Sequence, residues 1–177
     1  MNIVYAAPKP YGQPQVYISE VAKDVAKEIS YGSGDDLIAL VENIGGRVTY
    51  QELRELEKSD SGSILVEPDG KFEITLPNHT SMQRDRFTIA HEIGHLVLHF
   101  MLNKGKADHE GLAAARYGSG LVEYEANWFA ASFLMPDDQF KLCYESNAAD
   151  LNAVAAKFAV SLTAAAVRAK ALGLSGY

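Results

Sequence analysis

The sequence predicts an α+β domain that is mostly helical, with a small β-sheet and a helical pair at the C-terminal end. Apolar residues recur at helical spacing in several segments that are separated by short breaks. Two β-rich runs flank "EPDG", whose Pro and Gly suit a tight turn. The chain has 177 residues, of which 47% are hydrophobic, and this is enough to bury the core of one domain.

The N-terminal part of the chain predicts an arm, two helices and a strand. Prolines are frequent at the start, so we expect an extended arm over residues 1–14. Helical spacing predicts a helix over residues 15–30, and a second helix is expected from residue 34 or 35 to Asn43. Two glycines then end this helix, and "RVTY" is expected to form a short strand. The polar segment "QELRELEKSD" that follows is ambiguous.

The middle of the chain predicts a hairpin and a long helix. "SILVEPDGKFEITLP" is expected to form two paired strands, the second of which ends at Pro77. A helix then begins near Thr80 or Ser81, because either hydroxyl suits an N-cap, and continues to about Phe100. Residues 103–120 carry glycine and charge and are expected to form a loop.

The C-terminal part of the chain predicts three more helices. The first covers about residues 121–134. "DLNAVAAKFAVSLTAAAVRAKALGL" then predicts two short helices, with Asp150 capping the first and Gly173 ending the second. We therefore expect a single domain over residues 15–177, with a helix-turn-helix-like pair at about 150–173.

Composition restricts the classes of function. The formal net charge is −7, from 16 Lys and Arg against 23 Asp and Glu, which gives no electrostatic footprint for nucleic acid or an anionic membrane. Cys143 is the only cysteine, so a reducing compartment is expected. The N-terminus lacks the pattern of a secretory signal, and no apolar run approaches the roughly 20 residues that span a bilayer. We therefore expect a soluble cytoplasmic protein.

The segment "FTIAHEIGHLVLHF" places metal-binding side chains in an otherwise apolar helix. His91 and His95 are four residues apart, so both imidazoles project from one helix face with Cβ atoms about 5–6 Å apart. They can therefore bind one ion without backbone distortion. Glu92 is rotated by about 100° from His91, where it can reach a water beside that ion. This is the spacing of the H-E-x-x-H metal motif.

An ordinary helix with tolerated polar positions is the alternative to a metal site. The helix carries an apolar stripe that predicts its burial, formed by Ile89, Ile93, Leu96 and Phe100. Buried histidines and a buried carboxylate are costly without partners, which favours the metal. Gly94 lowers helix propensity by about 1 kcal/mol relative to alanine, but it lets another element approach closely.

The third ligand is not expected from the same helix. His99 lies about 12 Å along the helix axis from His91, so these two residues and His95 cannot all share one ion. We expect His99 to pack in the core or to support a ligand. The longer motif of metzincins is absent, because it requires glycine at Leu98 and histidine at Met101.

The segment "LVEYEANWFAASFLMP" contains the expected third ligand. Glu123 and Asn127 are four residues apart, and Ala130 continues the same face, so this helix can approach Gly94 and the histidines. We expect Glu123 to complete the metal site and Asn127 to orient a ligand imidazole. Solvated surface charge is the alternative for Glu123. The neighbouring apolar stripe comprises Val122, Ala126, Phe129 and Phe133.

Other acidic and basic residues are rival ligands. Glu125 shares its side of the helix with Trp128 and Ser132 and is expected to be more exposed. His109 and Glu110 fall within the predicted loop.

Together, the motifs "RFTIAHEIGHLVLH" and "EYEANWFAASFLMP" closely resemble those of the ImmA/IrrE metallopeptidases. The resemblance covers roughly residues 15–174, with specific motifs and generic flanks. It implies a zincin-like domain with a gluzincin-like zinc site whose ligands are His91, His95 and Glu123. The catalytic base is then Glu92. The resemblance also implies a site-specific protease whose substrate is a helix-turn-helix transcriptional repressor, encoded near the protease in some members.

Two expectations about the reaction follow. Hydrolysis at such a site needs a further group that stabilises the carbonyl oxygen, and the candidates are His109, Arg116, Tyr117 and Tyr124. If "KFEITLP" lies at the sheet edge, an extended substrate pairs with it by β-augmentation, and an ordinary structural strand is the alternative. Specificity then comes from docking elsewhere, on the C-terminal helices or the N-terminal arm.

Two other classes of function are alternatives to an enzyme. A DNA-binding regulator is one, because the C-terminal segment has the rhythm of a helix-turn-helix. Its second helix, however, offers only Arg168 and Lys170 as cations, and a DNA-reading helix normally carries several polar or basic groups. The other is a non-catalytic partner-binding protein, or a toxin–antitoxin component, that retains the metal. An intact Glu92 favours the enzyme, because a purely structural site gains nothing from a base.

Overall fold

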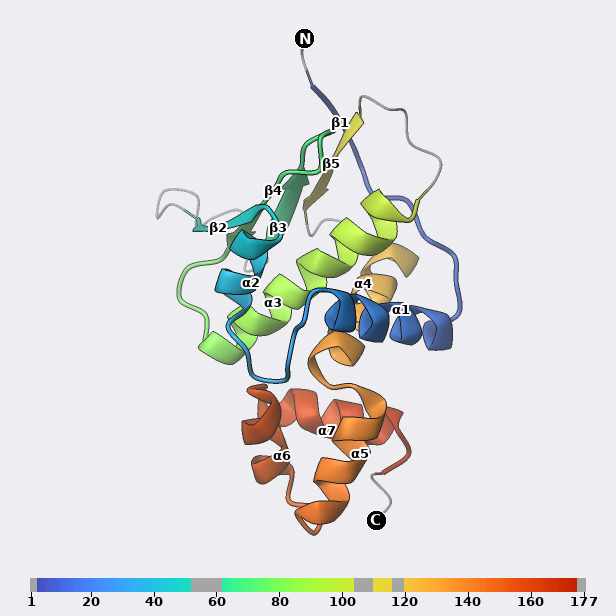
Figure 1. Cartoon of the computed structure of the whole chain (residues 1–177), viewed down its shortest axis with the longest axis vertical. Helices are drawn as coiled ribbons and strands as arrows, with labels where there is room; N and C mark the ends of the chain where they lie inside the picture. Colours follow the sequence, from blue (N-terminus) through green and yellow to red (C-terminus); the bar gives the residue numbers. More distant parts are fainter. Residues whose placement is uncertain (1–2, 52–61, 104–109, 116–119, 175–177) are drawn as a thin grey trace.

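The computed structural model describes residues 3–51, 62–103, 110–115 and 120–174 (Figure 1). The strands are β1 (Val4–Ala6), β2 (Gly46–Tyr50), β3 (Ser63–Val66), β4 (Phe72–Leu76) and β5 (Glu110–Ala115). The α-helices are α1 (Gln15–Glu28), α2 (Leu37–Asn43), α3 (Met82–Gly94), α4 (Leu121–Leu134), α5 (Asp137–Ser146), α6 (Leu151–Phe158) and α7 (Leu162–Ala171). A π-helix, η2 (His95–Met101), continues α3. This arrangement confirms the predicted α+β class.

The described strands form one mixed sheet in the order β1-β5-β3-β4-β2. Strands β3 and β4 are antiparallel with Ile64 opposite Ile74, which confirms the predicted hairpin. The Glu67 amide donates a hydrogen bond of 2.8 Å to the Lys71 carbonyl across the turn. On its other side, β4 pairs in parallel with β2. The edge position considered for "KFEITLP" is therefore wrong, because a strand lies on each side of β4.

Strand β5 lies within residues 103–120, for which the sequence predicts a loop, and that prediction is wrong for residues 110–115. Its sequence, "EGLAAA", consists mostly of small residues and lacks the usual alternation of apolar and polar positions. The strand forms because it pairs with β1 on one side and β3 on the other. At Gly111 the strands β5 and β3 are so close that a Cβ atom on Gly111 would lie 2.5 Å from the Val66 carbonyl oxygen. Strand β1 lies within the predicted N-terminal arm and is an edge strand of the described sheet.

Capping residues explain where several helices begin. The Ser81 hydroxyl accepts a hydrogen bond of 3.2 Å from the Arg84 amide, so Ser81 rather than Thr80 is the N-cap of α3. The Asp150 carboxylate caps α6, as predicted. Helix α5 has no counterpart in the sequence prediction. It begins after Pro136, and its first turn carries two aspartates, whose charge stabilises a helix N-terminus.

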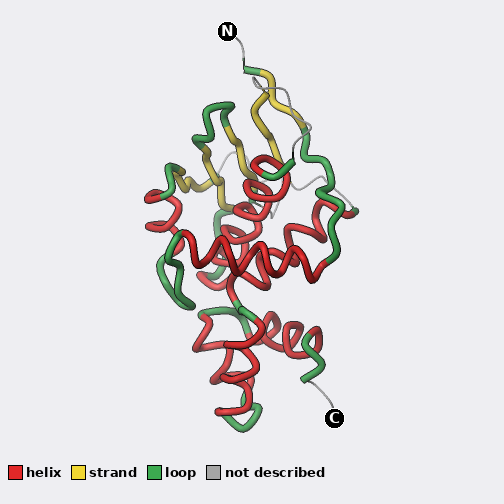
Figure 2. The backbone as a smooth tube through the Cα atoms, turned by 45° about the vertical axis from the view of Figure 1, so that its right-hand side comes forward, coloured by secondary structure: helices red, strands yellow, loops and turns green. Residues whose placement is uncertain are grey.

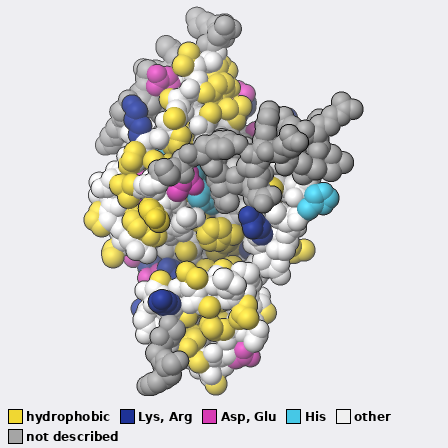
Figure 3. Space-filling view, turned by 180° about the vertical axis from the view of Figure 1, so that it is seen from behind, with side chains coloured by type: hydrophobic (Ala, Val, Ile, Leu, Met, Phe, Trp, Pro, Cys, Tyr) yellow, Lys and Arg dark blue, Asp and Glu magenta, His cyan; other side chains and the backbone are white. Residues whose placement is uncertain are grey.

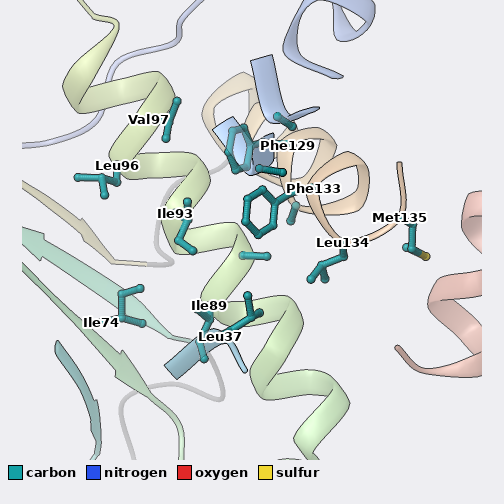
Figure 4. Close-up of a cluster of buried hydrophobic side chains, with 14 of the residues drawn as sticks. Leu37, Ile74, Ile89, Ile93, Leu96, Val97, Phe129, Phe133, Leu134 and Met135 are labelled. Atoms are coloured by element: carbon teal, nitrogen blue, oxygen red, sulfur yellow. The ribbon is translucent and has the colours of Figure 1, made fainter. Parts of the chain in front are cut away.

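The core lies between the sheet and the helices α3 and α4. Figure 4 shows Ile74 of β4 on one side of α3 and Phe129 and Phe133 of α4 on the other, with Ile89 and Ile93 of α3 between them. All five side chains are buried. Both predicted apolar stripes therefore pack into the core, which fixes α3 and α4 side by side. Helix α1 also packs against α4.

The helix that begins at Ser81 does not stay α-helical to Phe100, as the sequence predicts. It changes after Gly94 into a π-helix, in which hydrogen bonds join residues five apart, such as that of 2.9 Å from the Leu102 amide to the Val97 carbonyl. The apolar run after Gly94 carries no local signal for this change. This π-helix contains His99, whose contacts with His95 and with Glu125 of α4 are described below.

The C-terminal helices lie at the end of the molecule opposite the N-terminus (Figures 1 and 2). Helices α6 and α7 are bent by 104° relative to each other, an angle typical of a helix-turn-helix. The buried Arg168 of α7 donates hydrogen bonds to the Met135 carbonyl at 2.8 Å and to the Asp137 carboxylate at 2.6 Å. These contacts attach α7 to the end of α4. Burial lowers the pKa of Arg168, and the Asp137 carboxylate opposes this effect.

Within the described ranges, none of the helices is by itself long and apolar enough to cross a membrane.

Candidate metal centre

Three side chains, one each from α3, from its continuation η2 and from α4, converge on one point. His91 of α3, His95 of η2 and Glu123 of α4 each offer a ligand atom, and these atoms lie within 4.8 Å of one another. The two Nε2 atoms are 3.1 Å apart, and the Glu123 oxygens lie 3.2 Å from Nε2 of His91 and 3.6 Å from Nε2 of His95. Zinc bonds of about 2.0–2.1 Å at tetrahedral angles place neighbouring donors about 3.3–3.4 Å apart. The donor set therefore fits one small divalent cation.

The close approach of α4 to α3 depends on Gly94. A Cβ atom at Gly94 would lie 3.2 Å from the Cα and the carbonyl oxygen of Ala126. Both are backbone atoms, so any larger residue would push α4 away. This confirms that small residues let α4 approach Gly94, and the approach brings Glu123 to the two histidines.

Asn127 holds the ring of His91. Nδ1 of His91 lies 3.0 Å from Oδ1 of Asn127, and since an amide oxygen only accepts, Nδ1 carries the hydrogen. Nε2 of a neutral His91 then directs its lone pair toward His95 and Glu123. The structure thus brings Asn127 to the imidazole that it is predicted to orient.

His95 is held by a different chain of hydrogen bonds. Its Nδ1 lies 2.9 Å from Nδ1 of His99, and Nε2 of His99 lies 3.0 Å from Oε2 of Glu125. His99 therefore contacts the predicted ligand His95 and stays outside the donor set. Burial lowers the pKa of His99, while its hydrogen bond to Glu125 and the charge of Glu125 act in the opposite direction.

The expectation that Glu125 is more exposed than Glu123 is wrong. The Glu125 side chain is 0% exposed, whereas that of Glu123 is 19% exposed. The N-terminal arm covers this side of α4, where the Tyr11 and Gly12 amides donate to the Glu125 carboxylate at 2.9 and 2.6 Å. Helical spacing alone cannot show which face will be covered by a segment 113 residues away.

Glu92, the predicted base, directly follows His91 on α3 and is buried. The backbone of Gly62, just before β3, passes close to it. A Cβ atom on Gly62 would lie 3.3 Å from Oε1 of Glu92 and 2.4 Å from Cγ2 of Thr88. Any side chain at position 62 would therefore require Thr88 to shift. The sequence does not reveal this role of Gly62, because it depends on how the strand packs against α3.

Of the remaining candidates, the structure describes Tyr124 and Glu110, and neither belongs to the donor set. Tyr124 is 60% exposed and stacks against Trp128, with ring centroids 6.3 Å apart. Glu110 lies at the start of β5 in the sheet. His109, Arg116 and Tyr117 lie outside the described residues.

A cleft of about 950 Å³ opens beside the donors and reaches His91, Glu123 and Asn127. Its walls come from α3, α4 and α7, and its apolar lining includes Phe87, Trp128, Ala164 and Val167. In the space-filling view of Figure 3, a histidine side chain is visible near the middle of the molecule, with acidic side chains beside it and hydrophobic ones below. The C-terminal pair thus forms one wall of the space beside the donors.

Comparison with known families is consistent with this geometry. Residues 54–170 match the family of IrrE N-terminal-like domains. The match spans more than half of the chain and includes His91, Glu92, His95 and Glu123. The chain belongs to this family. The resemblance to the ImmA/IrrE metallopeptidases is thereby confirmed, although the segment before residue 54 lies outside the match.

The IrrE-like chain also has a fold similar to that of a Mycobacterium tuberculosis transcriptional regulator, with a TM-score of 0.61 and 17% sequence identity. The similarity covers 86% of this chain and 46% of the regulator, so this chain spans less than half of that protein. At this level of identity, the similarity shows the fold alone. No match was found among curated proteins.

Proposed function

We propose that this IrrE-like protein is a zinc-dependent endopeptidase that cleaves a protein partner at a specific site. One observation carries the proposal. Two imidazole nitrogens and a carboxylate converge at 3.1–3.6 Å at the edge of a large cleft, and the buried Glu92 directly follows one of the two histidines on α3. Membership of a metallopeptidase family supports the same conclusion.

Zinc is the cation that this donor set favours. Two histidines and one glutamate are the protein ligands of several catalytic zinc sites, whereas structural zinc sites usually have four protein ligands. A site with three protein ligands leaves a position for water or substrate. When bound, zinc lowers the pKa of a coordinated water to about 7 and polarises a carbonyl group.

Glu92 is the proposed base and acid of the reaction. Its carboxylate accepts a proton from the water whose oxygen attacks the peptide carbonyl carbon, and it then donates this proton to the leaving amine. Burial excludes bulk solvent from Glu92, which strengthens its interactions with polar groups of the substrate. His91 and His95 keep their orientation because Asn127 and His99 hold their outer nitrogens.

The cleft supports a peptide substrate with apolar side chains. Its volume of about 950 Å³ lies near the upper end of the range for ligand pockets, about 300–1,000 Å³. A peptide segment can place apolar side chains against Val167 and Trp128 while its scissile bond lies beside His91 and Glu123. The narrower proposal is that the partner is a helix-turn-helix transcriptional repressor, and the resemblance to ImmA/IrrE proteases supports this choice.

A non-catalytic partner-binding protein is the second candidate, in which the cation only holds α3 and α4 together. A buried Glu92 that directly follows His91 favours the enzyme over this candidate. DNA binding is disfavoured, because Arg168, one of the two cations of α7, is buried against Met135 and Asp137. Ala164 and Val167 of the same helix line the cleft.

The test compares wild-type protein with Glu92→Gln, each loaded with zinc. Both proteins are incubated with a proteome-derived peptide library and with repressors encoded near the gene, and the fragments are identified by mass spectrometry. We expect discrete fragments from the wild type only, and a chelator should abolish them. Glu92→Gln should still bind zinc, because Glu92 is not a ligand. If zinc-loaded wild type yields no more fragments than the variant, the endopeptidase is rejected in favour of the partner-binding protein.

A further inference from the structure

The N-terminal arm is connected to the metal centre by an unbroken chain of hydrogen bonds. The Tyr11 and Gly12 amides bind the Glu125 carboxylate, Glu125 binds Nε2 of His99, and Nδ1 of His99 binds Nδ1 of His95. Each contact is between 2.6 and 3.0 Å long. The chain therefore joins the backbone of the arm to a predicted metal ligand through two buried side chains.

The direction of each hydrogen bond follows from the chemistry of the groups. An ionised carboxylate only accepts, so Nε2 of His99 donates to Glu125. Nδ1 of a neutral His99 then accepts from the Nδ1–H of His95. In this tautomer, Nε2 of His95 carries the lone pair that can bind a cation. The chain thus selects the tautomer and the ring orientation that a metal ligand needs.

At its outer end, the chain of hydrogen bonds stops at the backbone amides of Tyr11 and Gly12, which have a specific conformation. Gly12 has a φ of +76°, a left-handed conformation that glycine adopts without strain. Consecutive amides next to such a residue can form a concave anion site, and here both amides point at one carboxylate. Because Glu125 is fully buried, it depends on these donors and on His99 to offset the loss of hydration.

The arm also covers the outer side of His99. A small cavity of about 40 Å³ lies between them and is lined by Ala6, Ala7, Lys9 and His99. The family match begins at residue 54, so these contacts come from outside the matched region. The arm therefore contributes contacts that support the metal centre and that come from neither of the two motifs, the one with His91 and the one with Glu123.

We propose that Glu125 and His99 are positioning residues for His95, and that docking of the arm at Tyr11 and Gly12 sets the affinity of the centre for its cation. This inference rests on the metal site of the proposed function, but it does not require peptidase activity. Binding equilibria are reciprocal, so if the docked arm strengthens metal binding, the metal must strengthen arm docking to the same extent.

The experiment measures zinc affinity by competition with a chromogenic chelator, together with the visible spectrum of the cobalt-substituted protein. Glu125→Gln should weaken zinc binding about 10–100-fold, the range typical of groups that orient a ligand, and should change the cobalt spectrum. Gly12→Ala acts at the remote end of the chain, where the added Cβ meets nothing within 4 Å but the backbone is strained. It should weaken zinc binding about fivefold or more.

Gly45→Ala is the matched control for strain. Gly45 also has a positive φ of +90° and open space for a Cβ, but it follows α2 and makes no contact with the hydrogen-bond chain. It should leave zinc affinity unchanged. Hydrogen exchange provides the reciprocal measurement: zinc should slow exchange of the Tyr11 and Gly12 amides in the wild type but not in Glu125→Gln.

The outcomes separate this inference from the proposed function. Zinc binding that is equally tight in wild type, Glu125→Gln and Gly12→Ala overturns the inference and leaves the metallopeptidase intact. An equal loss of affinity in Gly12→Ala and Gly45→Ala also overturns it, because general strain then explains the effect. Wild-type protein that takes up no zinc at all refutes the metal site, and with it both proposals.

Discussion

Gly94 and Ala126 meet where α3 and α4 pack together, and a methyl group on Gly94 would lie 3.2 Å from the Ala126 backbone, so that α4 would have to shift by a few tenths of an ångström. This contact sets the distance between the helix that carries His91 and the one that carries Glu123. The spacing of the donors therefore depends on a residue that has no side chain to bind a metal.

Gly94→Ala tests this dependence. Alanine favours a helix by about 1 kcal/mol over glycine, but forcing a methyl group into a packed contact typically costs about 1–3 kcal/mol. We expect the free energy of unfolding of the metal-free protein to change little or to fall, and zinc affinity to fall clearly, because α4 moves away from His91. Urea denaturation and chelator competition measure the two effects. A more stable variant with unchanged zinc affinity would contradict the proposed spacing role.

Glu123→Gln tests the carboxylate donor. The amide keeps the shape of the side chain but loses its charge. Loss of a residue that only orients a ligand typically weakens metal binding about 10–100-fold, and we expect Glu123→Gln to weaken zinc binding by more than this. Glu145→Gln is the control, since Glu145 is an exposed carboxylate on α5. Competition with a chelator measures both variants. Equal affinity for Glu123→Gln and wild type would exclude Glu123 as a ligand.

Zinc should stabilise the folded protein. A cation that binds only the native state raises the free energy of unfolding by about 2.7 kcal/mol when its concentration is one hundred times its dissociation constant. We expect the midpoint temperature of thermal unfolding to rise when zinc is added and to fall back to its metal-free value when a chelator is added. His95→Ala should remove this response. A zinc-dependent shift of the same size in His95→Ala would place the binding site elsewhere.

Val167→Trp tests whether α7 forms a wall of the substrate cleft. Val167 lines the cleft and is 64% exposed, so a larger side chain can be accommodated by the fold but occupies the space of a substrate. We expect kcat/KM for a cleaved peptide to fall about tenfold or more, with unchanged zinc affinity. Leu162→Trp is the matched control, because Leu162 is 49% exposed on the same helix but does not line the cleft. Similar kinetics for both variants would remove α7 from the substrate site.

Arg168→Met tests the attachment of the C-terminal pair. Methionine keeps much of the buried volume but loses the hydrogen bonds to Met135 and Asp137, so we expect a loss of about 2–3 kcal/mol in the free energy of unfolding. Arg47→Met is the comparison, because Arg47 pairs with Glu73 on the exposed side of the sheet. That pair is solvated and should contribute much less. Similar losses in the two variants would contradict a special role for Arg168.

The sequence was a good guide to the elements whose signals are local. Ser81 and Asp150 lie at helix starts because their side chains bond nearby amides, and these bonds depend on residues two or three positions away. The hairpin is encoded by its turn and by the β-rich runs beside it. Strand β5 could not be predicted in this way, because "EGLAAA" becomes a strand only through its partners β1 and β3.

The same distinction applies to the candidate site. His91 and His95 could be placed together because four residues bring them onto one helix face, and the small residue at Gly94 indicated that another helix approaches. The burial of Glu125 cannot be predicted in this way, because the arm that buries it is distant in sequence. Gly62 gave no signal, since its closeness to Glu92 arises only in the folded protein.

Helix α7 lies across the cleft from the donors and belongs to a part of the chain that supplies none of them. Its surface can therefore change during evolution without altering the chemistry of the cation. Under the proposed function, substitutions at positions such as Ala164 and Val167 would change which peptides fit the cleft and would leave the donor residues unchanged.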